Sequence, residues 1–164
     1  MKKNIGKILA VILVVSVLAT VLCACVPSKF TKAEANLKKN GYVATVIENG
    51  DVVNGANAMA VLAAEHYGIK LTGKCEAVVT GVSKDGKQNV TIYYFDNAKD
   101  AKAFKKAYKA DVKKAKDELK KAKDSGELSE SEYKEMLNEI KGSKYGVSGK
   151  AFYLGDKEAV KACN

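Results

Sequence analysis

The chain contains no arginine: all 28 of its basic residues are lysines. Arginine provides the planar two-point contacts with phosphates and guanine edges on which nucleic-acid recognition depends, so its absence argues against nucleic acid as a partner. The formal net charge of +9 does not change this, because three lysines lie in the first seven residues and many others are concentrated in one stretch, 97–124. The excess positive charge is therefore local and does not extend over the whole molecule.

Histidine is nearly absent as well, occurring once at His66, and there are only four cysteines. A catalytic or metal-binding histidine needs partners, and no Ser-His-Asp or Cys-His set can be assembled except through His66. The cysteines form no Cys-x-x-Cys pair and lack the histidine-rich spacing of a metal site. The sequence therefore predicts no metal, no cofactor and no catalytic residues.

An export signal opens the chain. Residues 1–7, MKKNIGK, carry three positive charges and no negative one, and an apolar run from Ile8 to Leu22 follows. These are the basic and apolar regions of a signal peptide. Because the lysines stay on the cytoplasmic side while the rest is translocated, we expect the folded part to lie outside the cytoplasm.

The segment Leu22-Cys23-Ala24-Cys25 resembles the lipobox of bacterial lipoproteins, which reads Leu, a small residue, Ala or Gly, and then the cysteine that carries the lipid. The resemblance implies that residues 1–24 are a signal peptide and that Cys25 bears the lipid. Cys23 fills the position usually held by Ser, Ala or Thr. The implied location is the outer face of a bacterial cell membrane, with the lipid on Cys25 as the anchor.

Two alternatives for the leader stay open. Ile8–Val26 is about 19 apolar or small residues, long enough to remain as an uncleaved membrane anchor, and the same pattern also fits ordinary secretion. All three place the folded part outside the cytoplasm. That location permits a disulfide between Cys75 and Cys163 without requiring one.

Residues 25–30 are predicted to be a spacer and 31–164 a single domain. Apolar periodicity and turn residues predict, in order, a helix at 32–40 with a Thr31/Glu34 capping box, a strand at 42–47, a helix at 56–67, a hairpin at 73–96 that turns at Asp85-Gly86, a helical hairpin at about 97–142, a strand at 145–155 and a closing helix. This order predicts an α+β fold of the ferredoxin-like βαββαβ type. We expect an antiparallel sheet with the helices on one face, plus an extra N-terminal helix, an inserted helical hairpin and a C-terminal helix.

The helical hairpin is the most distinctive predicted element. Gly126 breaks its long first arm, and Ser129 and Glu132 form a capping box that starts the second. Its stretch LKKAKDSGELSESEYKEMLNEIK is similar to SHOCT modules, short helical hairpins thought to act in oligomerisation. The lysines of the first arm fit either a solvated face or a surface for anionic headgroups or polymers.

Two further motifs are set aside. Gly146-Val147-Ser148-Gly149-Lys150 lacks both the first glycine and the final Ser or Thr of a phosphate-binding loop. Tyr93-Tyr94-Phe95 lie in a strand and are interpreted as core aromatics.

These features favour a small lipid-anchored extracytoplasmic protein that is not an enzyme and acts by binding. Its partner would be a protein, or a second copy of the chain, recognised through the helical hairpin. The alternative is an enzyme, or an accessory subunit of an enzyme or transporter, with a site near His66.

Overall fold

The computed structural model describes residues 26–48 and 72–164. The leader with Cys25, the helix predicted at 56–67 and His66 lie outside the described residues. Within the described part, no helix combines the length and apolar character needed to cross a membrane.

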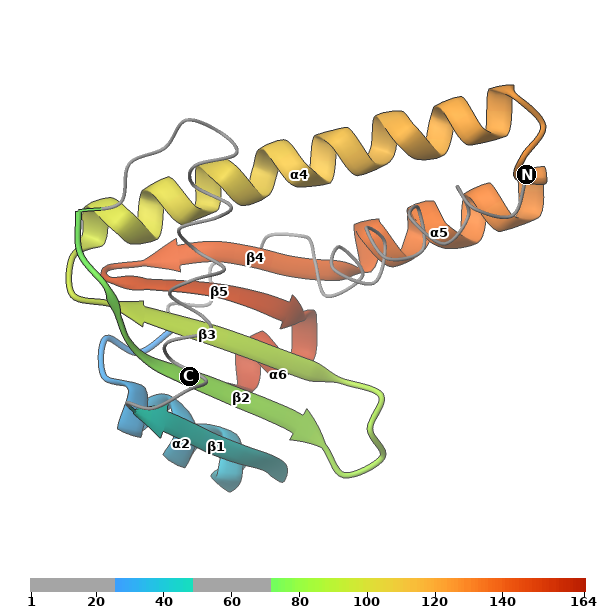
Figure 1. Cartoon of the computed structure of the whole chain (residues 1–164). Coiled ribbons are helices and arrows are strands. Elements are labelled where there is room, and N and C mark those ends of the chain that lie inside the picture. Colours follow the sequence, from blue (N-terminus) through green and yellow to red (C-terminus); the bar gives the residue numbers. More distant parts are fainter. Residues whose placement is uncertain (1–25, 49–71) are drawn as a thin grey trace.

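The core of the fold is a five-stranded sheet in the order β1-β2-β3-β5-β4, in which every pair of neighbours is antiparallel (Figure 1). This confirms the predicted α+β class and the antiparallel sheet. The strands are β1 (Tyr42–Glu48), β2 (Cys75–Ser83), β3 (Asn89–Phe95), β4 (Ser143–Ser148) and β5 (Ala151–Asp156).

The strand order differs from the ferredoxin-like arrangement. In a split βαβ plan, the two strands joined by a crossover helix run parallel. Here the edge strand β1 pairs directly and antiparallel with β2, from Tyr42 with Ser83 to Glu48 with Ala77. The strand predicted at 145–155 is also two strands, because Gly149 adopts φ +58° and turns β4 back onto β5. The sequence prediction was therefore wrong in strand order and in strand number here.

Helices cover both faces of the sheet, where one face was expected. They are α2 (Phe30–Lys39), α4 (Ala98–Asp124), α5 (Glu130–Gly142) and α6 (Lys157–Ala162). Helices α2 and α6 pack on one face of the sheet. Helix α4 covers the other face over β3, β5 and β4, and α5 folds back along α4 (Figure 1). The reason lies in strands such as β5, whose residues 151–155 are all buried. A strand that is buried on both sides requires cover on both sides.

Two apolar clusters result, one on each side of the sheet. The α4-side core lies between the sheet and the helical hairpin α4–α5, and its fully buried members include Phe95, Phe152, Leu119 and Ile140. The α2-side core lies between the sheet and helices α2 and α6, and it includes Val26, Leu37, Ile92 and Val160.

Local signals at the helix ends are mostly confirmed. Ser129 and Glu132 form the predicted capping box of α5, and the positive φ angles of Gly41 and Gly126 end α2 and α4. The Thr31/Glu34 box is not formed, because α2 begins at Phe30 with Lys29 as its N-cap and no side chain caps it.

Candidate functional site

The first described residues are packed into the domain. Val26 is 2% exposed and belongs to the α2-side core. Its carbonyl accepts a hydrogen bond from Ser148 Oγ at 2.7 Å, and the carbonyl of Pro27 accepts one from the Tyr94 hydroxyl at 3.0 Å. The predicted spacer at 25–30 thus contains residues that are packed into the domain, and the apolar character of Val26 is the only sign of this in the local sequence.

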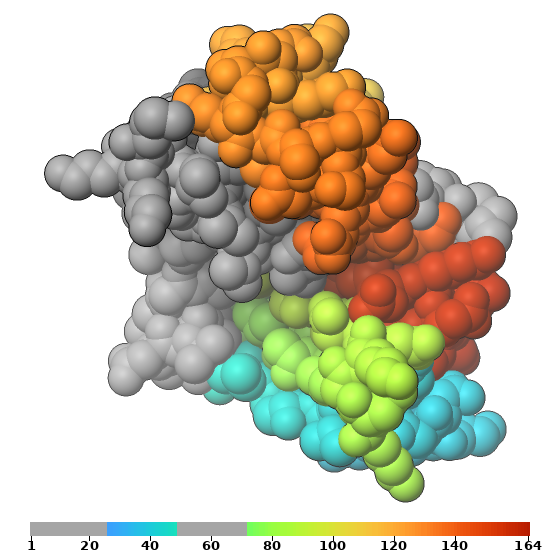
Figure 2. Space-filling model, turned by 90° about the vertical axis from the view of Figure 1, so that its right-hand side faces the viewer, coloured from blue at the N-terminus to red at the C-terminus, as the bar shows by residue number. Residues whose placement is uncertain are grey.

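The packed residues Val26 and Pro27 mark one end of the described domain, which we call the anchored end. The turn between β4 and β5 lies there, as does the end of β3, since Phe95 N donates to Lys150 O at 3.0 Å. Helix α4 starts directly after β3 and runs away from the anchored end (Figure 1). The tip of the hairpin at Gly126 and the β2–β3 loop lie at the opposite end, which faces the viewer in Figure 2 in orange and yellow-green.

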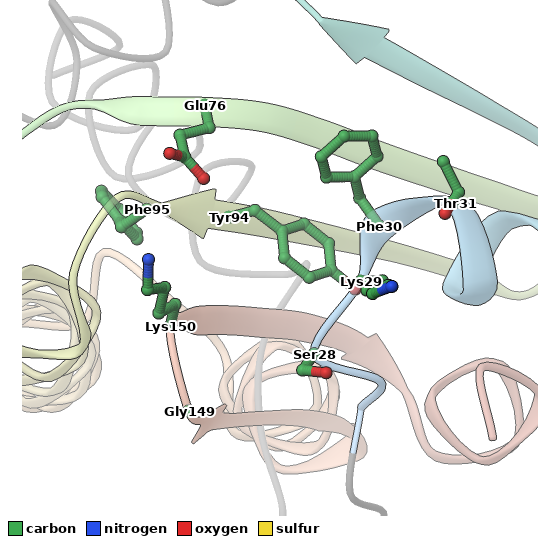
Figure 3. A pocket seen from close by; sticks show the side chains of 9 residues that line it. All are labelled: Ser28, Lys29, Phe30, Thr31, Glu76, Tyr94, Phe95, Gly149 and Lys150. Carbon is green, nitrogen blue, oxygen red and sulfur yellow. The ribbon is translucent and has the colours of Figure 1, made fainter.

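A cavity of about 530 Å³ opens at the anchored end. Its floor and walls are partly aromatic, with Phe30 edge-on to Tyr94 at a centroid distance of 5.8 Å and an interplanar angle of 72°. Exposed Lys29, Lys150 and Glu76 supply its charges. Figure 3 shows the lining residues, which are Ser28, Lys29, Phe30, Thr31, Glu76, Tyr94, Phe95, Gly149 and Lys150.

The electrostatics of this cavity favour an anion. Lys29 and Lys150 carry two positive charges against the single carboxylate of Glu76, and the uncapped first turn of α2 adds the positive end of a helix dipole. Lys150 and Glu76 project from opposite sides of the cavity (Figure 3), and within the described part they form no ion pair with each other. Burial raises the pKa of the Tyr94 hydroxyl, so it remains a hydrogen-bond donor to Pro27.

Helix α4 carries a second charged surface, a row of exposed lysines that we call the lysine row; the first five are spaced three or four residues apart, and the sixth follows seven residues later. In the first half of α4, 98–110, the only acidic residue is Asp100, which is buried and hydrogen-bonded to Thr72 and Gly73. The lysine row is Lys99, Lys102, Lys106, Lys109, Lys113 and Lys120.

The two described cysteines lie on opposite sides of the sheet and are not joined by a disulfide. Cys75 belongs to the α4-side core, because a bulge between Cys75 and Ala77 turns its side chain to that face, and Cys163 belongs to the α2-side core. Each Sγ donates at 3.3 Å to a backbone carbonyl, of Ala77 and Ala159 respectively. Burial raises the pKa of Cys75 to about 11 and that of Cys163 to about 12, so both thiols stay protonated at neutral pH.

The structure thus adds a site that sequence reasoning missed and leaves two predicted positions untested. Cys25 and His66 lie outside the described residues. The cavity joins residues from four separate segments, and the only hints in the sequence were the apolar Val26 next to Cys25 and the Gly149-Lys150 turn. Residues 26–48 and 72–164 hold no group of three or more side chains arranged to bind a metal ion. Compared with protein-family models, curated proteins and solved structures, the chain matches none.

Proposed function

We propose that this chain is a lipid-anchored extracytoplasmic protein that holds its domain against the outer face of the cell membrane and presents its helical hairpin to a partner. It acts by binding and not by catalysis. The observation that carries the proposal is the docking of Val26, which follows Cys25 directly and is buried in the domain.

Covalent geometry links the anchor to one end of the fold. Consecutive Cα atoms across a trans peptide bond lie 3.8 Å apart, so a lipid on Cys25 would leave the protein beside Val26 without an intervening linker. Helix α4 has 27 residues, which at 1.5 Å per residue extends about 40 Å from the anchored end to the hairpin tip. A rigid domain tethered in this way offers the hairpin tip at a defined height above the membrane.

The surface of the hairpin favours a polar, charged partner. Its apolar side chains Leu119, Ala122 and Leu128 are buried between its two arms, so they are not available to a second molecule. The exposed residues near the tip are mostly lysines and carboxylates, and Lys123 pairs with Glu130 across the arms at 2.7 Å. A partner surface with a complementary charge pattern therefore fits the hairpin better than a partner surface with an apolar groove.

Lipidation is tested by metabolic labelling with a fatty acid in cells that express the full chain. Cys25→Ala should abolish incorporation, and Cys23→Ala, the matched control two residues away, should retain it. Labelling of Cys25→Ala together with loss in Cys23→Ala would show that the lipid lies on Cys23. Absence of label from the wild type would remove the anchor from the proposal.

The binding role is tested by crosslinking in intact cells. Lys120→Glu and Lys121→Glu near the hairpin tip should reduce crosslinks to the partner, whereas Lys84→Glu and Lys87→Glu in the β2–β3 loop should leave them unchanged. Equal crosslinking by both sets of variants would exclude the hairpin as the binding surface.

A further inference from the structure

We infer that the anchored end docks onto the phosphate groups of the bilayer that carries the lipid, with Lys29 and Lys150 at the mouth of the cavity as the phosphate-contacting residues. The inference rests on the proposed lipid anchor and deepens it, because it assigns a face of the domain to the membrane.

Lys29 and Lys150 lie close to the residue that would carry the lipid. Ser28 and Lys29 follow the buried Val26 within three residues, and Lys150 is held beside them because Ser148 Oγ binds Val26 O. A lipid attached immediately before Val26 would bring the bilayer surface to this part of the domain. The cavity opens there, so its charged mouth would meet the headgroup layer before any other part of the described surface.

The charge and the size of the cavity suit a phosphate headgroup. Lys29, Lys74 and Lys150 are all exposed at the anchored end, where the exposed carboxylates are Glu76 and, on the edge strand β1, Glu48. Lysine ammonium groups bind phosphates as point charges, so the absence of arginine from the chain does not weaken this contact. The volume of about 530 Å³ lies within the range of small-ligand pockets, about 300–1,000 Å³, and is compatible with a headgroup.

Aromatic residues line part of the cavity. Phe30 is the partly exposed ring of the cavity, and it packs edge-on against the buried Tyr94, whose hydroxyl is fixed on Pro27 O. Phenylalanine side chains on elements that lie at a membrane surface bury their rings at the boundary between headgroups and acyl chains. The cavity therefore offers an apolar surface next to two cations. This arrangement matches a membrane interface, where apolar acyl chains lie next to anionic phosphates.

The same geometry assigns a different role to the lysine row of α4. That helix starts at the anchored end and leads away from it (Figure 1), so most of the row points into the space above the bilayer. Its positive charge is screened from the headgroups beyond a Debye length of about 8 Å at physiological salt. Docking on the membrane is therefore assigned to Lys29 and Lys150 and not to α4.

The test measures how fast individual lysines react with an amine-acylating reagent, using the full lipidated protein and mass spectrometry of its peptides. The protein is compared in vesicles containing phosphatidylglycerol and in a nonionic detergent. Lys29 and Lys150 should react about fivefold more slowly in the vesicles, and high salt should remove much of this protection because it screens the contact. Lys84 and Lys87, exposed controls at the opposite end, should react equally in both. Equal rates for Lys29 and Lys150, or equal protection of the controls, would overturn the docking.

Two further arms make the result specific. Inorganic phosphate added in detergent should leave Lys29 and Lys150 unprotected; full protection there would overturn the assignment to lipid. The double variant Lys29→Gln, Lys150→Gln should release the protection of Lys74 in vesicles, while the variant Lys84→Gln, Lys87→Gln should keep it. Persistent protection of Lys74 in the first variant would overturn the role of the two residues.

The docking and the anchor fail in distinguishable ways. Intact mass shows whether Cys25 carries the lipid, and flotation shows whether the protein is held on the vesicles. Protein that floats with unprotected lysines refutes the docking alone. Protein without lipid refutes the proposed function, and the docking with it.

Discussion

Tyr108 on α4 has a buried hydroxyl that makes no hydrogen bond within the described residues. Its ring lies edge-on to that of Tyr145, with centroids 4.9 Å apart, so the aromatic contact does not depend on the oxygen. Burial, with smaller contributions from Tyr145 and Asp111, raises the pKa of this hydroxyl. A buried polar group without a partner keeps its desolvation cost, typically about 1–3 kcal/mol.

Tyr108→Phe should therefore raise the free energy of unfolding by about 1 kcal/mol, measured as a higher midpoint in urea. Tyr94→Phe is the matched control, because the Tyr94 hydroxyl donates to Pro27 O at 3.0 Å and its loss should lower stability by a similar amount. A lower midpoint for Tyr108→Phe would show that its hydroxyl has a partner in solution.

Asp100 in the first turn of α4 is fully buried and bonded on all sides. Its carboxylate accepts hydrogen bonds from the backbone N–H of Thr72 and of Gly73 and from the side chain of Asn97. Burial alone would raise the pKa of Asp100, but these hydrogen bonds outweigh it and hold the pKa below its usual value. The carboxylate thereby holds the segment just before β2 against the start of α4.

This shift makes stability depend on pH with a defined sign. The folded protein binds the proton on Asp100 more weakly than the unfolded chain, whose aspartate pKa is about 3.9. The stabilisation is complete above that pH and is lost as the pH falls through the lower, folded pKa. Asp100→Asn should be less stable at pH 7 by about 1–3 kcal/mol and should lose less of its stability below pH 4 than the wild type does. If the free energy of unfolding falls with pH in parallel for the wild type and Asp100→Asn, the proposed role of Asp100 in this pH dependence is contradicted.

At the scale of elements, the end of α4 is set by Gly126. Its φ is +75°, the N–H of Glu127 donates to Ala122 O at 2.9 Å, and the N–H of Gly126 donates to Lys123 O at 3.0 Å. These two bonds are a Schellman motif, which satisfies the last carbonyls of the helix. A residue with a Cβ adopts this backbone conformation at a cost of about 1–2 kcal/mol.

Gly126→Ala should therefore lower stability by about 1 kcal/mol and speed hydrogen exchange at the amides of the turn. Gly142→Ala is the matched control: Gly142 closes α5 without a positive φ, and a Cβ there meets nothing within 4 Å, so that variant should be neutral or slightly more stable. Equal losses in both variants would contradict the role of the Schellman turn.

Elements with local signals could be predicted from the sequence. The helical hairpin, its break at Gly126 and its capping box all rest on residues fewer than five positions apart, where turn and cap chemistry decides the structure. The strand order could not be predicted, because the pairing of β3 with β5 joins residues about 60 positions apart through contacts that leave no periodic pattern. The same reason explains why the docking of Val26 on Ser148 was missed. It also explains why a disulfide between Cys75 and Cys163 remained open, since the sequence does not show that the sheet separates these thiols.

At the scale of the whole molecule, α4 joins the anchored end, which we propose to face the membrane, to the hairpin tip, which we propose to face a partner. The strands of the sheet run roughly along α4, so the sheet also extends from one of these ends toward the other (Figure 1). If the domain stands upright on its anchored end, the lysine row extends away from the membrane. If the protein lies flat on the lysine row, every lysine in it contacts the headgroups. In the first arrangement the lysine row is free to contact a partner above the membrane, and in the second it contacts the headgroups. Measuring the distance of α4 from the membrane distinguishes the two arrangements.

Two exposed positions on α4, Lys99 and Lys121, give that measurement. They are 22 residues apart on one helix, about 33 Å at 1.5 Å per residue. Lys99→Cys and Lys121→Cys can each be labelled with a fluorophore at neutral pH without removing Cys75 and Cys163, because burial raises the pKa of these thiols to about 11 and about 12. In vesicles that carry a quencher on the headgroups, the label at position 99 should be strongly quenched and the label at position 121 only weakly, because α4 rises from the anchored end. Equal strong quenching at both positions would mean that the lysine row lies on the bilayer, and the hairpin would then be a membrane contact and not a surface for a partner.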